Sequence, residues 1–140
     1  MPRSGWMNGM FCTLQRINCG WPKRALHYSG IPMSICVING TLETHYSIIG
    51  GIVGMEGVGP LLGTARKAGV LVMGDKALAA DDTAARVMGV DPSRVDSLAM
   101  SHKTRLGSLR QEDIDVTCGK IEKVRIVFAL EQKYAFMRAL

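Results

Sequence analysis

Several features that mark well-known protein classes are missing from these 140 residues. The cysteines, at positions 12, 19, 36 and 118, form no C-x-x-C pair. Such short spacings are what bring thiolates together around zinc or an iron–sulfur cluster. We therefore expect free, mostly buried thiols and no metal site. The start, Met1–Trp6, lacks the apolar stretch of a signal peptide, so we expect a cytoplasmic protein.

Charge of one sign and long hydrophobic runs are also sparse. Lys and Arg number 17 and Asp and Glu 12, with no run of five or six like charges, and only 6% of residues are aromatic. We therefore expect no nucleic-acid partner. The most apolar stretch, Tyr46–Gly63, is interrupted by Glu56, Pro60 and several glycines, which excludes a membrane-spanning helix. With 47% hydrophobic and 21% charged residues, the composition is that of one globular domain.

Two short apolar segments predict the central sheet. Tyr46–Val53 and Gly69–Gly74 are apolar at successive positions, as in strands that are covered on both faces. A helix is expected directly after the second segment, capped by Asp75 and ended by Gly89. These patterns predict an α/β fold with a partial, mostly parallel sheet and flanking helices.

The flanking segments give weaker signals. Ser34–Leu42 predicts a short helix, and Asp91 followed by proline predicts a second one that fades near His102. Apolar and polar residues alternate over 113–118 and 124–128, which predicts two half-exposed strands. A short amphipathic helix is expected at the end of the chain.

Glycines between the two apolar segments predict a ligand-binding loop. Gly54, Gly57 and Gly59 follow the first strand directly, with Glu56 among them. Glycine allows positive φ and exposes bare N–H groups, as phosphate and other anion sites require. The segment matches neither the Walker loop nor G-x-G-x-x-G, so a ligand cradle and a purely structural turn both remain open.

Adjacent aspartates in the predicted helix 75–89 differ in their expected roles. Asp81 falls on the apolar stripe and must find a donor, a cation, a metal or backbone amides, because an unpaired buried charge is very costly. Asp82 falls off the stripe and is expected to form an exposed pair with Arg86, worth about 0.2–0.5 kcal/mol. Asp81→Asn should therefore remove any ligand effect, and Asp82→Asn should be nearly silent.

No pattern identifies a reaction. His27 is a candidate for proton transfer because histidine is the side chain type most often used for it near neutral pH, although a lone histidine is more often structural. Serine-hydrolase, zincin and calcium-loop motifs are absent. We therefore assign no catalytic residue and no cofactor.

Four stretches resemble the domain of unknown function 362 family, namely Gly20–Lys23, Leu26–Ile31, Ile52–Pro60 and Gly74–Pro92. The resemblance covers roughly residues 7–119 and leaves 120–140 as a divergent tail. Family members are longer α/β proteins of unsettled biochemistry. The resemblance thus implies one truncated domain over residues 1–140, the carboxyl-terminal half of a family domain, and we expect the missing half as a partner.

Some family members carry a ferredoxin-type cysteine cluster in an additional segment that this chain does not contain. The family also usually has an acid where Gly50 stands and a polar residue where Val58 stands, which weakens any site formed by those positions. Glu56, Asp81 and His27 stand at matching positions.

Our leading hypothesis is a pocket for a small anionic or metal-linked ligand between the glycine segment and the helix that bears Asp81. Its candidate binding residues are Gly54, Glu56, Gly57, Gly59, Asp81 and His27. The first alternative is a non-catalytic fragment or assembly subunit, whose exposed sheet edge pairs with a second copy or with the missing half. The second is an iron–sulfur-family redox protein that lacks its cluster segment.

Overall fold

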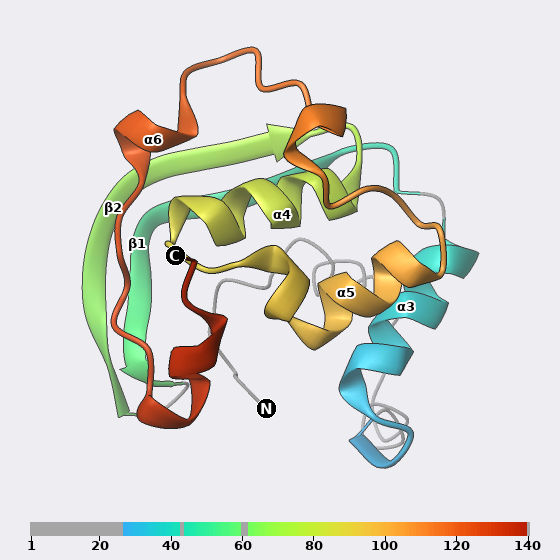
Figure 1. Ribbon diagram of the computed structural model, residues 1–140, viewed down its shortest axis with the longest axis horizontal. Coiled ribbons are helices and arrows are strands. Elements are labelled where there is room, and N and C mark those ends of the chain that lie inside the picture. Colours follow the sequence, from blue (N-terminus) through green and yellow to red (C-terminus); the bar gives the residue numbers. More distant parts are fainter. Residues whose placement is uncertain (1–26, 43, 60–61, 140) are drawn as a thin grey trace.

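The computed structural model describes residues 27–42, 44–59 and 62–139, and in them a two-stranded sheet packs against a group of helices (Figure 1). In chain order the elements are α3 (Ile31–Thr41), β1 (Ser47–Val58), β2 (Leu62–Gly74), α4 (Ala77–Val87), α5 (Asp96–Lys103) and α6 (Ile121–Val124). Short 3₁₀ helices cover Pro92–Arg94, Gln111–Asp113 and Gln132–Met137. The fold therefore combines α and β elements, as the sequence predicts.

The predicted parallel sheet is wrong. β1 and β2 form an antiparallel hairpin, in which Ser47 pairs with Gly74 and Val58 with Leu62. Only residues 59–61 join the strands, whereas a parallel connection needs roughly a dozen residues or more. Most of the glycine segment therefore belongs to the strands, which extend beyond their predicted ends and leave only three residues between them.

A bulge bends the hairpin near its middle. The register shifts between Gly51 and Val53, so that Ala68 and Gly69 lie opposite the single residue Ile52. Gly69 has φ +68°, a conformation that a residue with a Cβ rarely adopts. The extra residue explains the strong curvature of both strands (Figure 1).

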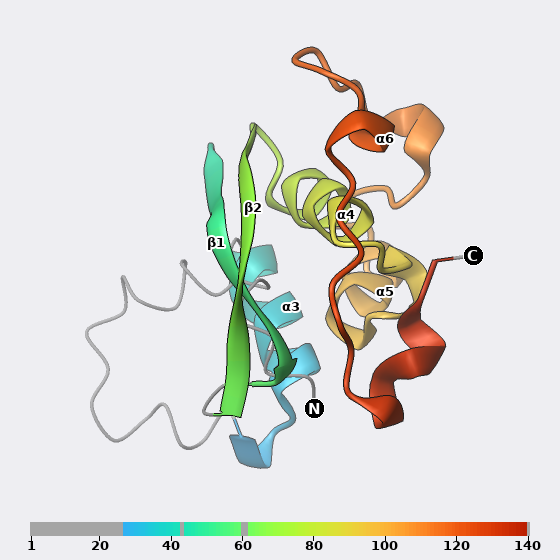
Figure 2. The ribbon, with the colours of Figure 1, turned by 90° about the vertical axis from the view of Figure 1, so that its left-hand side faces the viewer.

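The helices α4, α5 and α6 lie on one side of the sheet (Figure 2). α4 covers the inner face, where Ala80 and Ala84 contact Ile49 of β1 and partly buried Val72 of β2. Small alanine side chains at i and i+4 let the helix approach the strands closely. The helix ends as predicted at Gly89, which has φ +75° and donates to the carbonyl of Arg86 at 3.0 Å.

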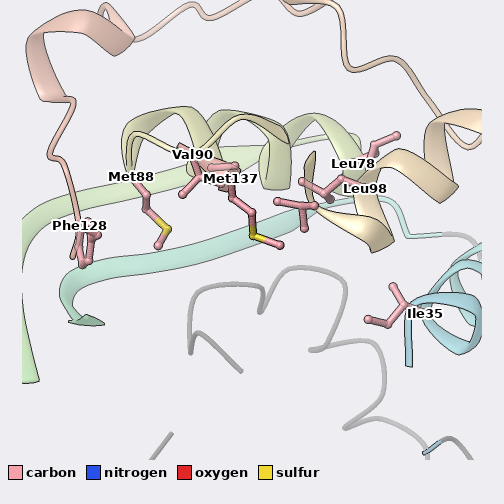
Figure 3. Packing of buried hydrophobic residues seen from close by; sticks show 9 residues of the cluster. Ile35, Leu78, Met88, Val90, Leu98, Phe128 and Met137 are labelled. Atoms are coloured by element: carbon pink, nitrogen blue, oxygen red, sulfur yellow. The ribbon is translucent and has the colours of Figure 1, made fainter. Parts of the chain in front are cut away.

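The other side of α4 faces the main hydrophobic core (Figure 3). This core draws on α3, α4, the chain from α4 into α5, and the tail, and it contains Ile35, Leu78, Ala85, Met88, Val90, Val95, Leu98, Phe128 and Met137. Phe128 is only 1% exposed. The tail after residue 120 is therefore part of the same core as α4.

The two strands predicted in the tail are wrong. Residues 114–118 and 125–128 form no regular element, and the 3₁₀ helix Gln111–Asp113 and α6 lie next to them. The isolated bridges of the tail join Leu130 to Gly57 and Arg138 to Val90. None of the described helices is long and apolar enough to cross a bilayer.

Candidate functional site

The predicted glycine cradle is filled by the chain's own tail. Gly54, Glu56 and Gly57 lie in β1, and Gly59 lies in the turn after it. The N–H of Gly57 donates to the carbonyl of Ala129 at 2.9 Å, and the N–H of Ala129 donates to Oε2 of Glu56 at 3.0 Å. The Glu56 carboxylate also lies 3.9 Å from the Arg66 guanidinium. A ligand at these groups would have to displace residue 129.

Asp81 lies on a different part of the sheet surface. Its side chain is buried, 7% exposed, on the helix face predicted for it. The neighbouring Ala80 packs against Ile49, which precedes Glu56 by seven positions in β1. At about 3.3 Å per residue, those positions span roughly 23 Å along the strand. Neither of the two hollows described below is lined by both Asp81 and the glycine segment.

His27 is exposed at the start of the described chain, just before α3. No contact in the structure links it to Glu56 or Asp81 among the residues described. A shared ligand site for His27, Asp81 and the glycine segment therefore stays a prediction.

Asp82 is the aspartate for which the sequence interpretation is wrong. Asp82 is 1% exposed. Arg86 donates two hydrogen bonds to its carboxylate, from Nε to Oδ2 at 2.7 Å and from Nη2 to Oδ1 at 3.1 Å. Arg86 also donates from Nη2 to the carbonyl of Leu109 at 2.8 Å. The predicted partner is correct, but the segment after α5 covers the pair. The periodicity of one helix does not show that a segment from elsewhere in the chain packs over its polar side.

Burial governs the ionisation of Asp82. Desolvation raises the pKa of its carboxyl above the ordinary 3.8, and the nearby Arg86 opposes that shift without cancelling it. Beside the pair is a hollow of about 200 Å³. Its walls are Asp82, Thr83 and Arg86 from α4, with Gln111, Ile114, Val116, Gly119, Lys120, Ile121 and Glu122 from the tail. Because Arg86 already donates to four acceptor atoms, two on Asp82 and one each on Leu109 and Gln111, it offers little to a ligand there.

A second, larger hollow lies at the amino-terminal end of α4. It measures about 400 Å³ and is lined by Asn39, Leu42, Thr44, His45, Lys76, Ala77, Leu78 and Leu106. Small-molecule sites in proteins have volumes of about 300–1,000 Å³. This hollow adjoins the 47/74 end of the hairpin, whereas the glycine segment runs to the opposite end.

The start of α4 lacks the predicted cap. Lys76, and not Asp75, occupies the N-cap position, and no side chain accepts a hydrogen bond from the first turn. The first N–H groups of a helix have no intrahelical partner and carry a partial positive charge. In the wall of the hollow, Oγ1 of Thr44 is buried and has no hydrogen-bond partner. The sequence analysis missed Lys76, because it assigned the cap to Asp75, one residue too early. It also did not single out Thr44.

The two described cysteines, Cys36 and Cys118, lie in different environments. Cys36 is buried, with its sulfur 3.2 Å from Oγ of Ser101, and Cys118 is exposed. Cys12 and Cys19 lie outside the described residues. Within residues 27–139, apart from the undescribed positions 43 and 60–61, no three His, Cys, Asp or Glu side chains are grouped to hold a metal ion.

Comparison with known proteins gives one match. The family model described as a domain of unknown function, DUF362, matches residues 5–86. That range begins near the start predicted from the sequence and ends at residue 86, where we expected similarity to about residue 119. Searches of curated proteins and of solved structures found no significant match.

Proposed function

The chain belongs to the DUF362 family of domains of unknown function, and we propose that it binds a small anion in the hollow at the start of α4. The ligand class is the one expected from the sequence, but the location is new. The observation that carries the proposal is the Thr44 hydroxyl, which belongs to a residue in the wall of this hollow, is buried and has no hydrogen-bond partner.

Three features favour an anion at this position. The uncapped first turn of α4 presents N–H groups, and Lys76 adds a full positive charge beside them. Oγ1 of Thr44 is itself closed to solvent, so the side chain would have to turn toward the hollow to donate to an anionic oxygen and gain the missing hydrogen bond. Leaving a buried hydroxyl unsatisfied costs about 1–3 kcal/mol, so a ligand that pairs it gains that amount in addition to the charge attraction.

The opposite wall has a different polarity. Asn39 and Leu42 come from the last turn of α3 and its C-cap, where a helix carries partial negative charge. An anion is therefore attracted only to the α4 side of the hollow. A ligand with one phosphate or carboxylate group and an uncharged remainder fits this asymmetry best.

Thermal unfolding with inorganic phosphate tests the proposal. Phosphate should raise the melting temperature at constant ionic strength, and saturation at 100 times Kd corresponds to about 2.7 kcal/mol of added stability. Thr44→Val and Lys76→Met should each weaken this effect about tenfold or more in Kd. Lys103→Met, in the last turn of α5, removes the same charge elsewhere and should leave the effect unchanged.

Two results would contradict the proposal. One is the absence of any shift up to tens of millimolar phosphate in folded protein. The other is an equal shift in Lys76→Met and the unsubstituted chain, which would place the anion at another site. Divalent cations in the same assay test the metal-linked ligand separately.

A further inference from the structure

The outer face of the hairpin is apolar and exposed at its 47/74 end. In the first half of β1, buried residues at 47, 49 and 51 alternate with exposed residues at 48, 50 and 52. Across the sheet, Met73 pairs with Ile48 and Leu71 pairs with Gly50. The large side chains on this face, Ile48, Ile52, Leu71 and Met73, are 54–67% exposed. None of the helices α3 to α6 covers them, because α4, α5 and α6 lie on the other face and α3 packs against α5 (Figure 2).

The size of this face decides which kind of occupant it can hold. Its uncharged part comprises residues 47–52 and 69–74. Six residues at about 3.3 Å each, on two strands about 4.8 Å apart, form a strip roughly 20 Å long and 10 Å wide, or about 200 Å². Stable interfaces between separate proteins bury about 800 Å² on each partner. A segment of the same chain needs far less area, because its tether holds it near the face at an effective concentration of the order of millimolar.

The chain before α3 has the composition of such a segment. Residues 1–26, which precede the described chain, carry four basic and no acidic side chains, and residues 4–15 carry no charge at all. An uncharged segment can cover an uncharged face without desolvating an ion. The large apolar side chains of this stretch are Trp6, Met7, Met10, Phe11 and Leu14.

The family match places residues 5–26 in the same domain as the hairpin. The DUF362 model matches residues 5–86, a range that includes α3, β1, β2 and all but the last residue of α4. Elements of one domain pack around a shared core, and an apolar sheet face is buried against another element. α4 covers the inner face, and α3 packs against α5. Residues 5–26 are therefore the one long stretch of the matched range that is left for the outer face.

We propose that residues 4–15 pack on the outer face of the hairpin and cover Gly50. Gly50 leaves room for a large side chain, since no described atom lies within 4 Å of an added Cβ there. The connection is long enough. At about 3.3 Å per residue, position 10 can lie up to about 55 Å from His27. α3 is about 16 Å long, and with the short segments on either side of it His27 lies within about 50 Å of Ser47.

Tryptophan fluorescence tests this inference. The two tryptophans of the chain, Trp6 and Trp21, both lie outside the described residues, and in a Trp21→Phe background all emission comes from Trp6. Gly50→Asp should shift that emission to the red and increase its quenching by acrylamide, because the new charge lies beneath the segment. Val127→Asp, at a 56% exposed apolar position in the tail, is the matched control and should leave the emission unchanged.

Two results would overturn the inference. One is Trp6 emission that Gly50→Asp leaves unchanged in a protein that folds by circular dichroism. The other is a red shift that depends on protein concentration and on a mass above the 15.2 kDa of one chain, which would assign the face to a second copy. If Gly50→Asp does not fold, Leu71→Asn on the same face replaces it. The readout is Trp6 alone, so its outcome is independent of phosphate binding near α4.

Discussion

Removing Arg86 should destabilise the protein far more than the sequence alone suggests. In Arg86→Ala, the carboxylate of Asp82, which is 1% exposed in the unsubstituted protein, loses both hydrogen bonds of its ion pair. Deleting one partner of a buried ion pair costs about 3–5 kcal/mol. Arg86 itself is 25% exposed, so solvent screening places the expected cost near the lower end, about 3 kcal/mol. At about 3 °C per kcal/mol for a chain of this size, the melting temperature should fall by on the order of 10 °C.

The loss of stability in Arg86→Ala should be larger at neutral pH than at acidic pH. Because burial raises the pKa of Asp82 above 3.8, the folded state binds more protons than the unfolded state between those two values. Stability from this group therefore falls as the pH rises through that window. Arg86→Ala removes the group that lowers the pKa, so its cost should be largest at neutral pH and shrink on acidification, when Asp82 becomes neutral.

Urea unfolding at pH 7 and pH 5 measures both effects. Asp82→Asn should cost about 1 kcal/mol at either pH, since a neutral amide needs no cation. In a double variant that already carries Asp82→Asn, Arg86→Ala should cause a much smaller further loss of stability than it does alone. A cost below 1 kcal/mol for Arg86→Ala, unchanged between the two pH values, would mean that the pair behaves as a solvated surface pair and that the structural reasoning is wrong.

Two further substitutions test the fold. Phe128→Ala removes a fully buried ring from the core shared by α4 and the tail, so the free energy of unfolding in urea should fall by about 3–5 kcal/mol; a fall below 1 kcal/mol would show that the tail is not docked. Gly69→Val forces a β-branched residue to φ +68° at the bulge, and thermal unfolding should show a loss of about 1–3 kcal/mol. Gly50→Val in the same sheet lies at a position without positive φ and is the control, so equal losses in the two variants would contradict the bulge geometry.

Local chemistry in the sequence was sufficient for individual elements. Apart from Tyr46, the predicted apolar segments lie within β1 and β2, Gly89 follows the end of α4, and Asp91 caps the turn that begins at Pro92 by accepting from the N–H of Ser93. These features depend on a few neighbouring residues, through propensity, capping and φ preferences. The family assignment likewise followed from contiguous motifs.

Contacts between distant segments were decided only by the tertiary structure. Both strands extend through the glycines, and the few residues left between them decide that they pair antiparallel. The burial of Asp82 depends on the segment near Leu109, 27 positions later in the chain. Glu56 binds residue 129, and the α4 hollow is assembled from three separate segments. Periodicity reports which side of an element is apolar but not what lies against it, because that depends on packing between residues far apart in sequence.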